Sequence, residues 1–251
     1  MNKKLKLGIL VFIVGFIGIL STLTMDIVLP EEIQQKVSEL FTPLQFKLLS
    51  LINPTGLLLI TVVLGVLLYD KVNLKLPLFE KLTYGKKEIE LSGILKYGII
   101  GGIIAGILIT LVSVMFLPML PSDFIALGDK FKPTLVMRLF YGGLTEEILI
   151  RFGVMTLIIW LIFKLFGKLN SVVYWLGILV SAIIFGLGHL PVVFTFVDAP
   201  NAELIVYIIF GNAIGGIVFG WLYWKKGLEA AMVAHIFAHI IMLTGENMFN
   251  M

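Results

Sequence analysis

Seven long apolar runs restrict this chain to folds that cross a membrane. The hydrocarbon core of a bilayer is about 30 Å thick, so a helix that spans it needs about 20 consecutive apolar residues. Runs close to this length or longer recur along the whole chain. They are Leu7–Met25, Leu48–Tyr69, Tyr97–Ser122, Thr134–Phe166, Leu169–Val197, Leu204–Trp224 and Ala230–Gly245.

Composition and pattern narrow the fold to a bundle of helices. Apolar residues make up 59% of the 251 residues and charged residues 14%, whereas soluble domains contain about 45–50% apolar and about 25% charged residues. The same balance excludes a disordered chain, and the runs lack the alternation of β-barrel strands. We therefore predict an all-α, polytopic transmembrane bundle of about seven spans, with eight as the alternative, forming one membrane domain over residues 1–251.

The lysines indicate on which side of the membrane the N-terminus lies. If the spans alternate, the loops on the side of the N-terminus hold most of the lysines, including Lys86 and Lys87, and the opposite loops are rich in Asp and Glu. Short cytoplasmic loops are enriched in Lys and Arg, which predicts a cytoplasmic N-terminus. Small size and lysine-rich loops favour a prokaryotic plasma membrane. The net charge of +3 is spread over several loops, so no nucleic-acid partner is expected.

Ionisable side chains inside the apolar spans are the main functional clue. A charged group at mid-bilayer costs about 2.5–3.5 kcal/mol on insertion scales, so it needs a partner or a water-filled cavity. The chain has no cysteine, which excludes thiolate nucleophiles and Cys-ligated zinc. The candidates are Glu146, Glu147 and Arg151 in the fourth span, His189 in the fifth, and His235 and His239 in the seventh.

Helical spacing predicts which of these side chains lie on the same face of a helix. Glu147 and Arg151 are four residues apart, in the order that favours an ion pair on one helix face. Glu146 is rotated by about 100° from Glu147, so it is left free to act as a general base. His235 and His239 also share a face. Three imidazoles and a carboxylate can then converge, where they would position a water or bind a metal.

Each of these features also has a structural explanation. A Glu–Arg pair in a membrane helix is often a buried bridge, and a membrane histidine is often an interhelical hydrogen-bonding group. A proton-coupled transporter buries similar residues, although the first three spans here are nearly free of charge and do not mirror the later ones. From the residues alone, a transporter and a non-catalytic membrane scaffold or bacteriocin-immunity protein stay open as alternatives.

Three motifs in order resemble those of one protease family. They are Glu146-Glu147-Ile-Leu-Ile-Arg151 (EExxxR), Phe185-Gly-Leu-Gly-His189 (FxxxH) and His235-Ile-Phe-Ala-His239 (HxxxN type, with histidine in place of asparagine). Residues 134–243 resemble the protease core of the CPBP family, which includes type II CAAX prenyl endopeptidases and lysostaphin-resistance and abortive-infection proteins. The first three spans match only as generic hydrophobic helices.

The resemblance implies an intramembrane endopeptidase that uses a glutamate-activated water. It implies Glu146 as the general base, His189 as its partner in holding the water, and His235 as a group on the oxyanion side. It also implies a supporting role for Glu147, Arg151 and Phe185. The expected substrate is a peptide or protein that enters from the membrane or its surface, whereas substrate identity and oligomeric state are left open.

The histidine at position 239 affects whether a metal cofactor is expected. Asparagine offers an N–H group to an oxyanion, and a histidine ring can do the same, so His239 is the fourth catalytic candidate. Neutral histidines also bind metals, which makes His189, His235 and His239 alternative zinc ligands with Glu146 near the metal-bound water. We expect catalysis without a metal and keep zinc as the alternative.

Two geometric expectations follow from span lengths. A continuous helix over Thr134–Phe166 would be about 50 Å long, so we expect a break or bend near Gly142 and Gly143. Straight spans would also place His189 near the external end of its span and His235 nearer the cytoplasmic end of its own, which conflicts with a shared site.

Overall fold

Helices alone form the part of the chain that the structure describes. This computed structural model describes residues 2–26, 29, 31–85, 89–130, 133–197 and 199–249, so Lys86 and Lys87 of the predicted cytoplasmic loops lie outside the described residues. Seven helical stretches are long and apolar enough to span a bilayer, which confirms the predicted all-helical class and the number of spans. The spans are Lys3–Thr24, Pro43–Val72, Leu91–Met119, Leu135–Phe166, Ser171–Phe196, Ala202–Lys226 and Leu228–Phe249.

Several of the spans combine more than one helical segment. The first three contain α1 (Lys3–Ser21) and η1 (Thr22–Thr24); α3 (Pro43–Ser50), α4 (Ile52–Leu68) and η2 (Tyr69–Val72); and α6 (Leu91–Phe116) and η3 (Leu117–Met119). The last four contain α8 (Leu135–Met137), η4 (Arg138–Met155) and α9 (Thr156–Phe166); α10 (Ser171–Leu187) and α11 (Leu190–Phe196); α12 (Ala202–Lys226); and α13 (Leu228–Phe249). The shorter helices are α2 (Glu31–Leu40), α5 (Pro77–Tyr84) and α7 (Ser122–Lys130).

Local sequence signals set the ends of several helices. Asn170 and Asn201 cap α10 and α12, because their side-chain oxygens accept hydrogen bonds from the backbone N–H groups of Val173 and Leu204. Gly167 ends α9 with φ of 68°, a left-handed conformation that glycine adopts without strain.

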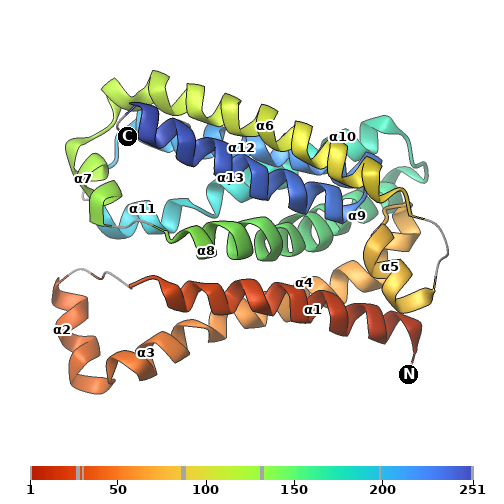
Figure 1. Ribbon diagram of the computed structural model, residues 1–251, viewed down its shortest axis with the longest axis horizontal. Coiled ribbons are helices and arrows are strands. Elements are labelled where there is room, and N and C mark those ends of the chain that lie inside the picture. The colour runs from red at the N-terminus through yellow and green to blue at the C-terminus, as the bar shows by residue number, and fades with distance from the viewer. Residues whose placement is uncertain are drawn as a thin grey trace.

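The segment η4 lies at the centre of the bundle. In Figure 1, α1 and α4 form a layer on one side of the green fourth span, and α13 and α6 lie on the other side, with the two termini at opposite ends. Contacts agree with this view, because η4 touches α1, α4, α10, α12 and α13. Side chains on η4 can therefore meet groups from both halves of the chain.

The central segment is a π-helix of 18 residues. π-Helices close hydrogen bonds from residue i to i+5 and usually occur as single turns, often at functional sites. The helix runs without interruption through Gly142 and Gly143, so the expected break is wrong. A helix with more residues per turn rises less per residue, which shortens this long span without breaking it.

Small residues on α1 and η4 allow close packing around this segment. The Thr145 hydroxyl of η4 donates a hydrogen bond of 2.7 Å to the Gly15 carbonyl of α1. A Cβ atom at Gly18 would overlap Thr145, and one at Gly153 would overlap Thr61 of α4. The first two spans therefore pack against one side of η4, and the other side of η4 faces the candidate site.

Candidate active site

A buried carboxylate, Glu147, joins η4 to α13. Its Oε2 atom lies 3.3 Å from Nε of Arg151, and both side chains are fully buried, so the predicted ion pair forms. Its Oε1 atom lies 2.9 Å from Nδ1 of His235. A carboxylate only accepts hydrogen bonds, so Nδ1 of His235 carries the hydrogen. Helical spacing predicts the ion pair with Arg151, but not the hydrogen bond from His235.

Glu146 stays outside this buried pair. Its side chain is 20% exposed, and its Oε2 atom lies 3.8 Å from Nε2 of His235, beyond hydrogen-bond distance. His235 therefore lies between two carboxylates, bonded to Glu147 through one ring nitrogen and facing Glu146 with the other. The two adjacent glutamates thus have different surroundings, as their rotation around the helix predicts.

His189 lies just beyond the C-terminal end of α10. Its Nδ1 atom is 2.8 Å from the carbonyl oxygen of Phe185. Because a carbonyl only accepts, Nδ1 carries the hydrogen, and Nε2 of the neutral ring keeps a lone pair. No hydrogen bond joins His189 to Glu146, although the structure describes both side chains.

The Phe185 ring connects His189 with the rest of the site. Its centroid lies 4.8 Å from the His189 ring and 6.2 Å from the His235 ring, and both rings meet it edge to face. The guanidinium carbon of Arg151 lies 4.8 Å from the same centroid, within cation–π range. The spans therefore bring both imidazoles to one aromatic ring, and the conflict expected from straight helices is resolved.

His239 stacks on His235 one turn further along α13. The ring centroids are 4.9 Å apart, and the ring planes differ by 17°. A Cβ atom at Gly142 would lie 2.5 Å from Nε2 of His239, so glycine makes room for this ring beside η4. Nδ1 of His239 is buried without a hydrogen-bond partner among the described residues. An unsatisfied buried polar atom is costly, which makes it a candidate contact for a substrate.

Phe219 of α12 is a site residue that the sequence analysis does not identify. Its ring stacks on His235 with centroids 4.6 Å apart, and it lies 5.5 Å from the guanidinium carbon of Arg151. It is one of 19 phenylalanines in an apolar chain, so the residue type alone does not mark it as part of a functional site. The nearby glycines Gly216 and Gly220, which pack against Ala182 and Ile178 of α10, are the visible sign of close packing here.

The three histidines do not fit zinc in the part of the chain that the structure describes. No group of three or more His, Cys, Asp or Glu side chains there is placed to hold a metal ion. The stacked rings of His235 and His239 are nearly parallel. In this arrangement their in-plane lone pairs do not converge on one ion about 2.0–2.1 Å from each.

Comparison with protein families finds one match, over the motif-bearing part of the chain. Residues 129–241 match the family described as type II CAAX prenyl endopeptidase Rce1-like, which confirms the resemblance drawn from the three motifs. The matched segment contains every candidate site residue, and the first three spans lie outside it. No curated protein and no solved structure matches the chain.

Proposed function

Because residues 129–241 match the Rce1-like type II CAAX prenyl endopeptidase family, we propose that this integral membrane protein is an intramembrane endopeptidase that uses a water activated by Glu146. The observation that carries the proposal is the position of His235, bonded to the buried Glu147 and facing the partly exposed Glu146. We place the protein in a prokaryotic plasma membrane with its N-terminus in the cytoplasm, and its substrate is a peptide that enters from the membrane or its surface.

In the proposed reaction, Glu146 and His189 hold the attacking water. The Nε2 lone pair of His189 accepts one hydrogen of the water, since Nδ1 donates to the Phe185 carbonyl. Glu146 removes a proton as the water oxygen bonds to the peptide carbonyl carbon. Glu146 then gives this proton to the amine as the C–N bond breaks.

His235 and His239 stabilise the negative charge on the tetrahedral oxygen. Glu147 stabilises the protonated form of His235, as the carboxylate of a catalytic triad does for its histidine. Protonated His235 then donates from Nε2, and the stacked His239 supplies a second N–H group. Arg151 balances the buried charge of Glu147, so protonated His235 is left to balance the negative charge that passes from Glu146 to the tetrahedral oxygen.

We propose that the reaction needs no metal, and elemental analysis tests this. Protein purified in detergent is expected to contain far less than one zinc per chain, and chelator treatment is expected to leave turnover unchanged. Stoichiometric zinc, together with loss of turnover on chelation and recovery on adding zinc back, would contradict the metal-free proposal.

The proposed activity is tested by comparing new peptide termini in membranes that contain the wild-type protein or the Glu146→Gln variant. We expect a set of termini that is present with the wild-type protein and lost with the variant. Glu203→Gln, at an exposed carboxylate in the first turn of α12, is the matched control and is expected to resemble the wild type. Identical termini in all three membranes would favour a scaffold. Loss of proton-driven uptake in the Glu146 variant would favour a transporter.

A further inference from the structure

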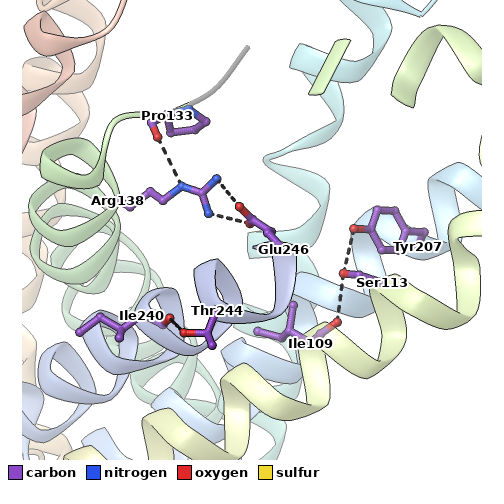
Figure 2. Close-up of polar contacts among 8 residues, drawn as sticks. All are labelled: Ile109, Ser113, Pro133, Arg138, Tyr207, Ile240, Thr244 and Glu246. Carbon is purple, nitrogen blue, oxygen red and sulfur yellow. Dashed lines mark hydrogen bonds and ion pairs between the residues drawn. The ribbon is translucent and has the colours of Figure 1, made fainter. Parts of the chain in front are cut away.

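An ion pair outside the proposed chemistry joins the same two helices that carry the glutamates and two of the histidines. Figure 2 shows Arg138 of η4 and Glu246 of α13 meeting through two parallel contacts, of 2.7 Å from Nη1 to Oε1 and 3.0 Å from Nη2 to Oε2. The Nε atom of Arg138 lies 3.4 Å from the Pro133 carbonyl oxygen. Such a bidentate pair fixes direction as well as distance.

On α13, Glu246 lies on the same face as the histidines. It follows His239 by seven residues and His235 by eleven, which correspond to about two and about three turns of an α-helix. This face meets η4 at three levels. Arg138 contacts Glu246, Gly142 lies against His239, and Glu147 contacts His235.

The matching face of η4 exists only because this segment is π-helical. Arg138 and Glu147 are nine residues apart, so in an α-helix they would point in opposite directions, about 180° apart. In a helix with hydrogen bonds from i to i+5, each turn holds somewhat more than four residues, and nine residues complete about two turns. Arg138, Gly142 and Glu147 can then all face α13. Arg138 is also the first residue of the π-helical segment.

We propose that Arg138 and Glu246 are positioning residues, a clasp that holds η4 in its π-helical register against α13. The clasp keeps Glu146 and Glu147 at the level of His235, eight and nine residues further along η4. Its loss would let the segment relax toward the more common α-helical geometry, which turns the two glutamates away from His235. The catalytic consequence rests on the proposed function, whereas the structural one does not.

Disulfide cross-linking tests the register without any assay of activity. The chain has no cysteine, so an introduced pair reports without background. A Cβ atom at Gly143 would overlap the Ile236 side chain, which places Gly143→Cys and Ile236→Cys within disulfide range. We expect Arg138→Gln or Glu246→Gln to lower the cross-linking rate at least about threefold, and the exchange of Arg138→Glu with Glu246→Arg to restore part of it. Lys4→Gln, which breaks the 2.7 Å pair of Lys4 and Asp70 elsewhere, is the control and should leave the rate unchanged.

Steady-state kinetics on a quenched-fluorescence peptide that the wild-type protein cleaves test the catalytic consequence. We expect Arg138→Gln to lower kcat at least about tenfold with KM within about twofold, because the pair positions the glutamates and does not touch the substrate. A raised KM with unchanged kcat would make the pair a substrate-binding element and overturn the clasp. Unchanged cross-linking in the single variants would also overturn it. If the wild-type protein cleaves no peptide in the library, the proposed function fails, and cross-linking still decides whether the clasp exists.

Discussion

Replacing Glu146 with glutamine is expected to slow peptide hydrolysis by about 10²–10⁴-fold, the usual contribution of a general base. The amide has nearly the same shape as the carboxylate but cannot take a proton from the attacking water. Glu146 has a 20% exposed side chain and no hydrogen bond to His235, so its loss should hardly change stability. The measurements are the cleavage rate of a peptide that the wild-type protein cleaves and the Tm in detergent.

Glu147→Gln provides the contrast that makes this result specific. It removes the carboxylate that bonds His235 and pairs with Arg151, so both the rate and the Tm should fall. Glu203→Gln should change neither. Full turnover of Glu146→Gln would remove Glu146 from the mechanism, and a large drop in its Tm would make its role structural.

The seven spans could be predicted from the sequence because contact with lipid depends on composition. A run of about 20 apolar residues is unstable in water, whichever segments of the chain flank it. The composition of η4 contains no comparable signal for its π-helical form. The π-helical form depends on a helix face that contacts α13 and contains Arg138, Gly142 and Glu147, spaced four and five residues apart. This match between the two helices can be recognised only when both are seen together.

The candidate site was predictable only within single helices. The pair of Glu147 and Arg151 follows from a spacing of four residues, and the different surroundings of Glu146 follow from its rotation. The bond from Glu147 to His235 crosses between helices, so it depends on their tilt and register, which sequence spacing does not contain. The same reason explains why straight spans misplaced His189 relative to His235.

Replacing Arg151 with methionine is expected to destabilise the protein by about 3–5 kcal/mol, because it leaves the charge of Glu147 buried without its cation. Both side chains have no exposed surface, and the guanidinium group also lies against the rings of Phe185 and Phe219. Unfolding by denaturant in detergent micelles measures the change. Lys4→Met removes a cation from a partly exposed pair and should cost about 0–1 kcal/mol.

The double variant Glu147→Gln with Arg151→Met separates stability from catalysis. Removing both charges takes away the unpaired carboxylate, so the double variant should be more stable than Arg151→Met alone. It should stay inactive, because an amide at position 147 no longer supports a protonated His235. If the double variant recovered cleavage along with stability, Glu147 would serve only to neutralise Arg151. A cost of less than about 1 kcal/mol for Arg151→Met alone would contradict the prediction. It would mean that the Glu147 carboxylate reaches solvent, whereas its side chain is 0% exposed in the structure.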